Sequence, residues 1–506
     1  MTVNEINREQ LVAAARESAR HPLDHFPPLV LYRCLEDAGA SLAAAAMAQL
    51  QSDDPAASEI LTMPRRGFGP RPVEILSPAS RTLYSALVDN LAPALPEASR
   101  REGAWSEHRE FGREGDHEYV VELDFAACYE LIDHGDLQRE LLLRSFDSTT
   151  VSALGALMQG IGRHGRGLPQ MLEASDRLAD AYLDIVDRNL MRRGYRLHRF
   201  ADDVRVLADE WDEANTIIEE AAAYGRSLGL ILSSAKTGIR RREVLDERED
   251  EAFNLLKDYL EQVTADLSEI LVVTGPYGSA EFDVEDPDDA EALSETYAKI
   301  LGEWHEEFRE SKDLGRPMSL PPGLTTHINT ALASAVARPQ ALTVDLLEDL
   351  VFHDPARLEN VCRYLLDRQN SGKSTRRLSN SLLRALTRMG RQSPWAKLWI
   401  LHASAEADGL PADAAAWVEQ QILDSHEVVR AEAAWTAACH GRLGTESLAG
   451  CYAKASNITM PALAAAAARQ QSFTEVEDAE LLSRHVVDAI RNDGPLNKEA
   501  YTWAQS

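Results

Sequence analysis

Basic residues are the scarcest charged class in this sequence. Its 506 residues contain 52 lysines and arginines against 82 aspartates and glutamates, which gives a formal net charge of -30 at pH 7. Contacts to nucleic-acid phosphates come from lysine and arginine, so this balance argues against avid, non-specific binding to duplexes. Any basic cleft must therefore be local. Lysine itself is absent before Lys236.

Cysteine is also sparse, and its spacing excludes two kinds of site. The five cysteines form no C-x-x-C pair, which predicts a reducing compartment and no structural zinc. They are Cys34, Cys128, Cys362, Cys439 and Cys451. The first residues lack the pattern of a signal peptide, and no apolar run is long enough to span a bilayer. We therefore expect a cytoplasmic protein of two or three domains.

Two adjacent aspartates stand at the centre of the most informative stretch, residues 199–205 (Arg-Phe-Ala-Asp-Asp-Val-Arg). The residues on either side have the alternation and aromatic content of strands, so Asp202 and Asp203 are expected at a hairpin turn. Aspartate is common in turns, and such a pair alone more often marks a turn than a metal site. Two carboxylates at one tip repel each other, however, unless a cation lies beside them.

A third carboxylate in similar surroundings favours the metal site. Residues 119–125 have an apolar strand pattern that ends around Asp124, and residues 126–129 open a helical stretch. A carboxylate at the end of a strand, beside a hairpin that carries two more, is the donor set that two-metal phosphoryl transfer requires. Mg²⁺ prefers such hard oxygen ligands and leaves positions for substrate phosphates.

The chain resembles the palm of reverse transcriptases through four motifs in the order those enzymes use. They are residues 123–129 for the first palm motif, 167–170 with Ser175 for the second, 200–203 for the aromatic-x-Asp-Asp box, and 229–237 for the motif after it. The sequence of residues 129–134 and 175–179 most resembles that of the abortive-infection and defence-associated (unknown-group) reverse transcriptases of bacteria. The resemblance covers roughly the first half of the chain.

This resemblance implies an α+β fold, with a right-hand polymerase palm and fingers built from an antiparallel sheet with flanking helices. It implies that Asp124, Asp202 and Asp203 hold Mg²⁺ or Mn²⁺, one ion activating a primer hydroxyl and the other supporting the departing pyrophosphate. The reaction would be DNA synthesis from dNTPs, either directed by a template or non-coding RNA or independent of a template. In the defence branch the resemblance also implies an antiphage role, homo-oligomers and DNA primed by a protein hydroxyl.

Lys236 completes the expected catalytic set. Arginine supplies every other permanent cation in this part of the chain. A retained lysine therefore indicates a need for a proton that can leave, which a guanidinium cannot supply. In the resemblance this lysine protonates the pyrophosphate as a general acid. A surface lysine is the alternative that the residues alone leave open.

Eight further residues are expected to bind substrate. Residues 63–72 are rich in Gly, Pro and Arg and are predicted to form a loop ahead of a strand at 73–76 and a helix capped by Ser77 or Ser80. Arg71 and one of Arg65 or Arg66 would clamp the triphosphate, and a solvated loop is the alternative. In the resemblance a tyrosine at position 129 excludes a 2′-hydroxyl from the incoming sugar. The full set is Arg65, Arg66, Arg71, Phe125, Tyr129, Gln170, Ser175 and Phe200. Met171 replaces the glycine that often follows the glutamine in this family, which puts ordinary templated copying in question.

The second half of the sequence is predicted to be helical. Residues 246–320 contain acidic helical segments typical of a thumb or connector, and the Gly- and Pro-rich stretch 315–323 marks a boundary. Amphipathic helices fill residues 321–506, where 424–435 resembles the second helix of a HEAT-type repeat. The predicted domains are therefore fingers and palm at 1–245, the thumb or connector, and the helical repeat-like domain.

Two other classes of protein remain open. The chain would be a catalytically silent scaffold if its helical domain were the working surface, although the joint presence of three carboxylates and Lys236 argues against this. It would be a retroelement-type enzyme if it copied a dedicated RNA. For a protein-primed reaction, candidate hydroxyls include those of Tyr277, Tyr452 and Tyr501, and the sequence selects none of them.

Overall fold

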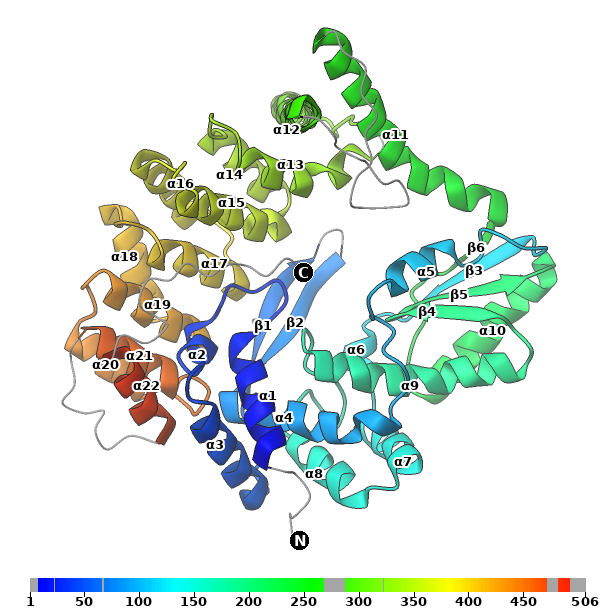
Figure 1. Cartoon of the computed structure of the whole chain (residues 1–506), viewed down its shortest axis with the longest axis horizontal. Coiled ribbons are helices and arrows are strands. Elements are labelled where there is room, and N and C mark those ends of the chain that lie inside the picture. The colour runs from blue at the N-terminus through cyan, green and yellow to red at the C-terminus, as the bar shows by residue number, and fades with distance from the viewer. Residues whose placement is uncertain are drawn as a thin grey trace.

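Helices predominate in this protein, and two antiparallel sheets lie in the first half of the chain. In Figure 1 a hairpin of β1 (Ser58–Arg65) and β2 (Phe68–Leu76) lies at the centre, the palm sheet lies at the right, and the helices after α12 (Pro287–Leu314) form an arc at the left. None of the described helices is both long and apolar enough to cross a bilayer. The computed structural model describes residues 8–21, 23–65, 68–267, 287–321, 323–470 and 481–491.

The palm sheet joins the two acidic motifs found in the sequence. Its strands are β3 (Tyr119–Asp124), β4 (Leu197–Phe200), β5 (Asp203–Ala208) and β6 (Gly238–Arg241). They are arranged in the order β4-β5-β3-β6, and every pair is antiparallel. The strands predicted on both sides of the Asp-Asp pair, and before Asp124, are therefore confirmed.

The two faces of this sheet differ because side chains alternate along each strand. Val204 and Val206 of β5 belong to the main hydrophobic core, and α9 (Glu173–Arg192) and α10 (Trp211–Ser227) pack on the sheet. Asp203 lies on the face away from that core, where it is aligned with Asp124 of β3.

The stretch 63–72 was predicted to be a loop, and this prediction is wrong for the described residues. Met63 pairs with Arg71 and Thr62 pairs with Pro72, so the stretch forms the outer half of the β1–β2 hairpin. Each strand of a two-stranded ribbon has one free edge, where the missing N–H of proline costs no ladder hydrogen bond. The predicted helix cap is confirmed, because the Ser77 hydroxyl accepts the N–H of Ser80 at the start of α4 (Pro78–Leu91).

The remaining helices surround these sheets. Those of the first half are α1 (Arg8–Arg20), α2 (Val30–Arg33), α3 (Gly39–Ser52), α5 (Ala104–Glu110), α6 (Cys128–Leu131), α7 (His134–Ser145) and α8 (Ser148–Met158). The capping aspartate predicted before α7 is confirmed, because Asp133 accepts the N–H groups of Gly135 and Asp136. The acidic helices predicted for the thumb or connector are α11 (Arg242–Leu267) and α12, which pack against each other.

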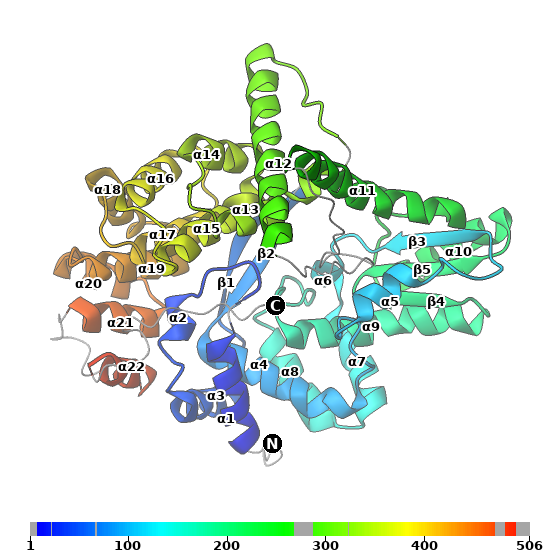
Figure 2. The ribbon, with the colours of Figure 1, turned by 45° about the horizontal axis from the view of Figure 1, so that its top comes forward.

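The C-terminal helices form two stacked rows, which Figure 2 shows from a second direction. In one row each odd-numbered helix from α13 to α21 packs on the next, and in the other α14, α16 and α18 do the same. The helical prediction is confirmed for the described residues, whereas the HEAT-type assignment stays a prediction. The helices are α13 (Ile328–Ala335), α14 (Val344–His353), α15 (Leu358–Asn370), α16 (Arg376–Arg388), α17 (Pro394–Ala405), α18 (Ala412–Gln421), α19 (Glu427–Cys439), α20 (Thr445–Tyr452), α21 (Met460–Gln470) and α22 (Leu481–Arg491).

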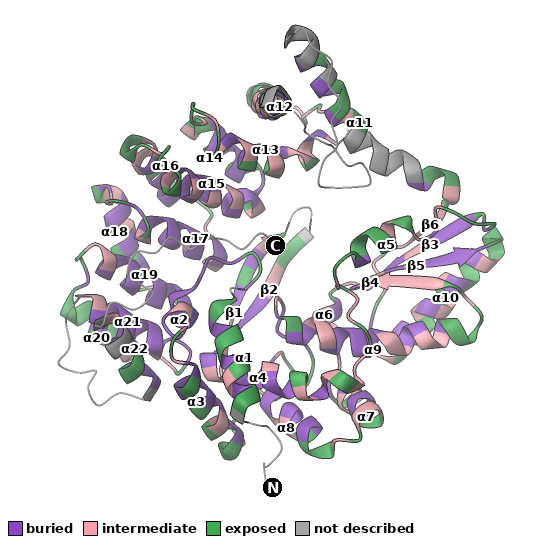
Figure 3. Cartoon of the chain, viewed as in Figure 1, coloured by how far each residue is buried: buried purple, intermediate pink, exposed green. Residues whose placement is uncertain are grey.

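The C-terminal helices α13 to α22, here called the helical array, are packed directly onto the hairpin of β1 and β2. The Glu59 carboxylate of β1 accepts the N–H groups of Glu427 and Val428, both at 2.9 Å, and so caps α19. The indole N–H groups of Trp395 and Trp399 both donate to the carbonyl oxygen of His25, at 2.7 and 3.0 Å. One hydrophobic core runs through both regions, and Figure 3 shows the buried residues continuing across them.

A buried carboxyl at this contact predicts that stability falls as the pH rises. Burial raises the pKa of Glu432, whose side chain accepts the N–H of Val30 at 2.6 Å, from 4.5 to about 8. The folded chain keeps a proton that the unfolded chain loses, so unfolding becomes easier from about pH 5 to about pH 8 and levels off above that. We expect Glu432→Gln to abolish this dependence, which amounts to about 5 kcal/mol for such a shift in pKa. Thermal unfolding midpoints measured across this pH range test the prediction. Glu419→Gln, at an exposed position, is the control. If the midpoint of Glu432→Gln changed with pH as much as that of wild type, the prediction would be contradicted.

Candidate active site

Three carboxylates meet where β3 ends and β5 begins. Asp124 and Asp203 are direct cross-strand partners, and Asp202 lies in the turn between β4 and β5. The turn is tight, because Ala201 has a left-handed φ of 53°. Burial, followed by the charges of Asp202 and Asp124, raises the pKa of Asp203 to about 6 despite Lys236 nearby. The site thus concentrates more negative charge than its surroundings neutralise.

Lys236 reaches the same point from a distant part of the chain. Its Nζ lies 2.5 Å from Asp124 Oδ2 and 3.9 Å from Asp203 Oδ1. Backbone contacts place it there: Phe125 and Leu232 form an isolated β-bridge, and the N–H of Ser233 donates to the Asp124 carbonyl at 2.8 Å. All four residues predicted for catalysis therefore lie together.

The donor set fits a divalent cation, although its present arrangement is an ion pair. In the described part of the chain no three acidic, histidine or cysteine side chains are already disposed around one point as metal ligands. Asp124 is instead paired with the Lys236 ammonium. The donors are hard carboxylate oxygens, and a cation beside them would offset the repulsion that Asp202 and Asp124 exert on Asp203.

Tyr129 is fixed beside this site by two residues that the sequence analysis did not select. Its hydroxyl donates to Asp176 Oδ1 at 2.5 Å, and Arg100 Nη1 donates to Asp176 Oδ2 at 3.2 Å. The Arg100 guanidinium also lies 5.9 Å from the centre of the tyrosine ring. This arrangement holds the ring in one orientation. In the sequence, Asp176 belongs to a stretch that resembles defence-associated reverse transcriptases, but no role was predicted for it. Arg100 lies in the connection between α4 and α5, which contains no recognisable motif.

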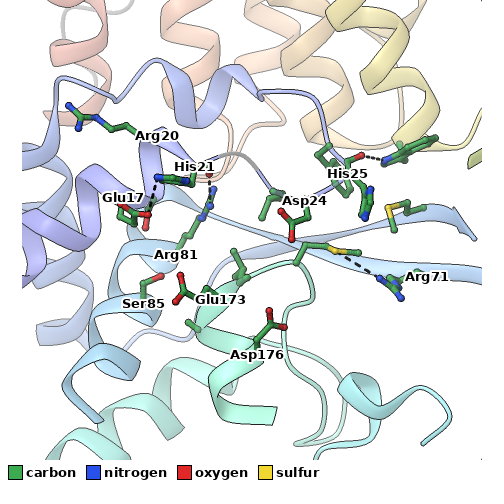
Figure 4. A pocket seen from close by; sticks show the side chains of 18 of the residues that line it. Glu17, Arg20, His21, Asp24, His25, Arg71, Arg81, Ser85, Glu173 and Asp176 are labelled. Carbon is green, nitrogen blue, oxygen red and sulfur yellow. Dashed lines mark hydrogen bonds and ion pairs between the residues drawn. The ribbon is translucent and has the colours of Figure 1, made fainter. Parts of the chain in front are cut away.

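Two arginines of the β1–β2 hairpin line a large cavity. It measures about 1120 Å³, and Arg65 and Arg71 line it together with residues of α1, α9 and the helical array. Figure 4 shows Arg71 at the right of this space and Asp176, near the start of α9, below it. Burial and the charge of Arg65 lower the pKa of Arg71, whereas Asp202 acts in the opposite direction. Arg66, the third predicted arginine, lies outside the described residues.

Met171 belongs to the same wall as Arg71. Its φ is 68°, in the left-handed region that favours glycine, which explains why glycine is the common residue here in the family that the sequence resembles. The Arg71 Nη1 lies 3.9 Å from the methionine sulfur. The larger side chain therefore fills space next to the predicted triphosphate arginine.

Three of the predicted substrate-binding side chains are largely buried, although one of them, Gln170, also lines a smaller cavity of about 370 Å³. Ser175 has no exposed surface, and its hydroxyl is hydrogen-bonded to the Tyr84 hydroxyl at 2.9 Å. Phe125 is 1% exposed, and Gln170, at 9%, donates to the Pro72 carbonyl at 3.1 Å. Direct side-chain contact with substrate does not agree with the burial of Ser175 and Phe125. Their packing holds α9 and the Asp124 strand in place.

A buried arginine network supports the Asp-Asp turn from below. Arg199 Nε lies 2.7 Å from Asp187 and its Nη1 lies 2.6 Å from Asp180, and all three side chains are less than 10% exposed. The same Nη1 donates to the carbonyl of Ala201 at 3.0 Å. Burial raises the pKa of Asp187, which Arg199 opposes. The spacing of the acidic residues along α9 could have indicated this network in the sequence.

An antiparallel palm sheet backed by helices, with paired carboxylates and a lysine at one edge, defines the class of right-hand nucleic-acid polymerases. Comparison with protein families agrees: residues 64–256 match the family described as reverse transcriptase (RNA-dependent DNA polymerase). This stretch therefore matches a reverse transcriptase domain. The match covers less than half of the chain.

Comparison with other proteins adds little beyond this. A solved structure of telomerase from Candida albicans, in complex with a TWJ fragment of telomeric RNA, is similar at 12% sequence identity and a TM-score of 0.27. The similarity covers 64% of this chain and 66% of the telomerase chain, just under two thirds of its length. A search of curated proteins gave no match.

Proposed function

We propose that this protein is a DNA polymerase that adds dNTPs by two-metal catalysis, with or without an RNA template. The observation that carries this proposal is the cross-strand pairing of Asp124 with Asp203, with Lys236 Nζ within 4 Å of both. The reverse transcriptase domain supports it.

In this proposal each group of the site has one task. Asp124, Asp202 and Asp203 hold Mg²⁺ or Mn²⁺, which supplies positive charge to the reacting phosphate and hydroxyl oxygens. Lys236 donates a proton to the pyrophosphate as it leaves. Arg65 and Arg71 hold the triphosphate, because guanidinium groups match phosphate oxygens in charge and geometry.

Several finer features belong to the same proposal. The resemblance of the sequence to defence-associated reverse transcriptases supports a bacterial antiphage role and homo-oligomers, and the spacing of the cysteines supports a cytoplasmic location. We retain the division into fingers and palm at 1–245, thumb or connector at 246–320 and repeat-like domain at 321–506. A protein primer is compatible with the proposal, but Tyr452 is a poor candidate because its hydroxyl is buried without a hydrogen-bond partner. Tyr277 and Tyr501 lie outside the described residues.

The scaffold and retroelement classes make different predictions from a polymerase without a dedicated template. Purified protein is supplied with each labelled dNTP, with Mg²⁺ or with a chelator, and the products are run on denaturing gels after treatment with protease or RNase. We expect Mg²⁺-dependent label. Protease-sensitive migration would identify a protein primer, and dependence on one added RNA would identify the retroelement class. Absence of label with Mg²⁺ and Mn²⁺, with phage-infected cell extract supplied, would overturn the proposal.

Tyr129 provides a prediction about sugar selection. Its ring is held by Asp176, and it lies on α6, the helix that follows the Asp124 strand, so a smaller side chain is expected to open the space that a 2′-hydroxyl would need. We expect Tyr129→Val to raise the use of ribonucleotides relative to deoxynucleotides roughly 10- to 100-fold. Competition between labelled rNTPs and dNTPs measures this ratio. Tyr129→Phe keeps the ring and should remain selective; if both variants changed equally, the hydroxyl and not the ring would set the selectivity.

A further inference from the structure

An exposed tryptophan lies beside the catalytic hairpin and has no role in the proposal so far. Trp105, on α5, is 50% exposed. Its ring stacks on His108, with centroids 5.9 Å apart and planes at 23°, and its edge meets Phe200 at 5.1 Å. Phe200 is the cross-strand partner of Asp203. One aromatic ring therefore separates Trp105 from a catalytic carboxylate.

The support of this ring is rigid. Arg205 Nη1 donates to the carbonyl oxygens of His108 and Arg109, at 3.1 and 2.9 Å, and so ties the end of α5 to β5. His108 is 3% exposed and its Nδ1 lies 3.2 Å from that of His198. Burial, together with Arg205 and His198, lowers the pKa of His108 to about 3, so its ring is neutral at pH 7. Trp105 thus packs on a cluster of aromatic rings formed by His108, His198 and Phe200, here called the aromatic wall.

This wall stands on the catalytic face of the sheet. His198 is the cross-strand partner of Arg205, and Phe200 is that of Asp203, so all four side chains lie on the face away from the main core. A strand end that reaches Asp124 and Asp203 along this face would meet Phe200 and then Trp105.

We propose that Trp105 is a stacking platform for the 3′-terminal base of the DNA strand that this site extends. The inference rests on the proposed polymerase function and adds a binding residue to it. A nucleobase is flat and aromatic, and stacking on an aromatic side chain is tolerant of sequence because every base has a π-face. Such a contact needs no excess of positive charge, which suits a chain of net charge -30.

The chain offers a matched control. Trp211, at the start of α10, is 52% exposed and also meets one aromatic ring edge-on, that of Tyr119 at 5.7 Å. Tyr119 begins β3, whereas Asp124 ends it, so Trp211 lies at the far end of the sheet from the carboxylates. The exposure of the tryptophan is nearly the same at both places, whereas its position relative to the site differs.

The test uses single-stranded DNA that carries 2-aminopurine, a fluorescent base, either at the 3′ end or five nucleotides inside. Stacking on an indole quenches this fluorescence. With the full-length protein we expect quenching of the terminal probe only, loss of it in Trp105→Leu, and retention in Trp105→Phe and Trp211→Leu. Binding of the 3′ end should weaken about 10- to 100-fold in Trp105→Leu.

The outcomes separate this inference from the proposed function. Equal quenching in wild type and Trp105→Leu, with dNTP incorporation intact, would overturn the platform and leave the polymerase standing. Quenching of the internal probe alone would assign Trp105 to another part of the strand and overturn the inference as stated. If wild type incorporated no dNTP, the proposed function would be overturned, whatever the quenching result. Because leucine keeps an apolar contact with Phe200, thermal unfolding should show that Trp105→Leu remains folded.

Discussion

Replacing Asp203 by asparagine is expected to lower the rate of dNTP incorporation roughly 10³-fold or more, because the site loses a cation-binding oxygen where charge develops. The fold should survive the change. Asp203 stands close to the carboxylates of Asp124 and Asp202 in a half-buried place, so removing its charge relieves repulsion. Thermal unfolding without metal should therefore give a midpoint equal to or above that of wild type.

The control for this prediction lies on the same strand. Asp209 directly follows β5 and is exposed, and Asp209→Asn changes the same charge at the opposite end from the site. Its incorporation rate should match that of wild type. Equal activity of Asp203→Asn and Asp209→Asn would remove Asp203 from the catalytic set, and a much lower unfolding midpoint for Asp203→Asn would mean that its role is structural.

The local features of the palm were predictable because each is encoded by neighbouring residues. Alternation defined the strands on both sides of the Asp-Asp pair, and the apolar run before Asp124 defined β3. The hairpin at 58–76 was mistaken in part for a loop, since Gly and Pro are compatible with a two-stranded ribbon as well as with a turn. Local composition does not distinguish these structures.

Contacts between distant residues could not be predicted in this way. Glu59 caps a helix that begins 368 residues later, and His25 accepts hydrogen bonds from tryptophans 370 and 374 residues away. These contacts make the helical array part of the fingers' support and part of the cavity wall. A truncation after Gly323 would therefore expose the core of the fingers, and loss of activity in it would not distinguish a scaffold from a polymerase.

The acidic composition also has an explanation that only the structure provides. Four aspartates of α9 are paired with arginines, most of them from other segments: Asp176 with Arg100, Asp180 and Asp187 with Arg199, and Asp184 with Arg144 and with Arg188 of the same helix. These arginines are thus engaged in ion pairs with the protein's own carboxylates. Fewer are left for phosphate contacts, which is consistent with a site that holds its nucleic acid through local contacts and stacking.

Replacing Arg199 by methionine is expected to cause the largest loss of stability among these variants, about 3 to 5 kcal/mol, because two buried carboxylates lose their partner. Methionine fills much of the same volume, so the effect isolates the charge. The change also removes the hydrogen bond to the Ala201 carbonyl, which holds the turn that carries Asp202. Chemical denaturation measures the first effect, and dNTP incorporation below the unfolding transition measures the second.

Removing the orphaned charges separates these two effects. In Arg199→Met combined with Asp180→Asn and Asp187→Asn, most of the lost stability should return, since no buried charge remains unpaired. Incorporation should stay low, because the contact to the Ala201 carbonyl is still missing. Arg193→Met, at an exposed arginine after α9, should change neither quantity. If the triple variant recovered full activity, Arg199 would serve the fold alone, and the turn would hold its catalytic shape without that contact.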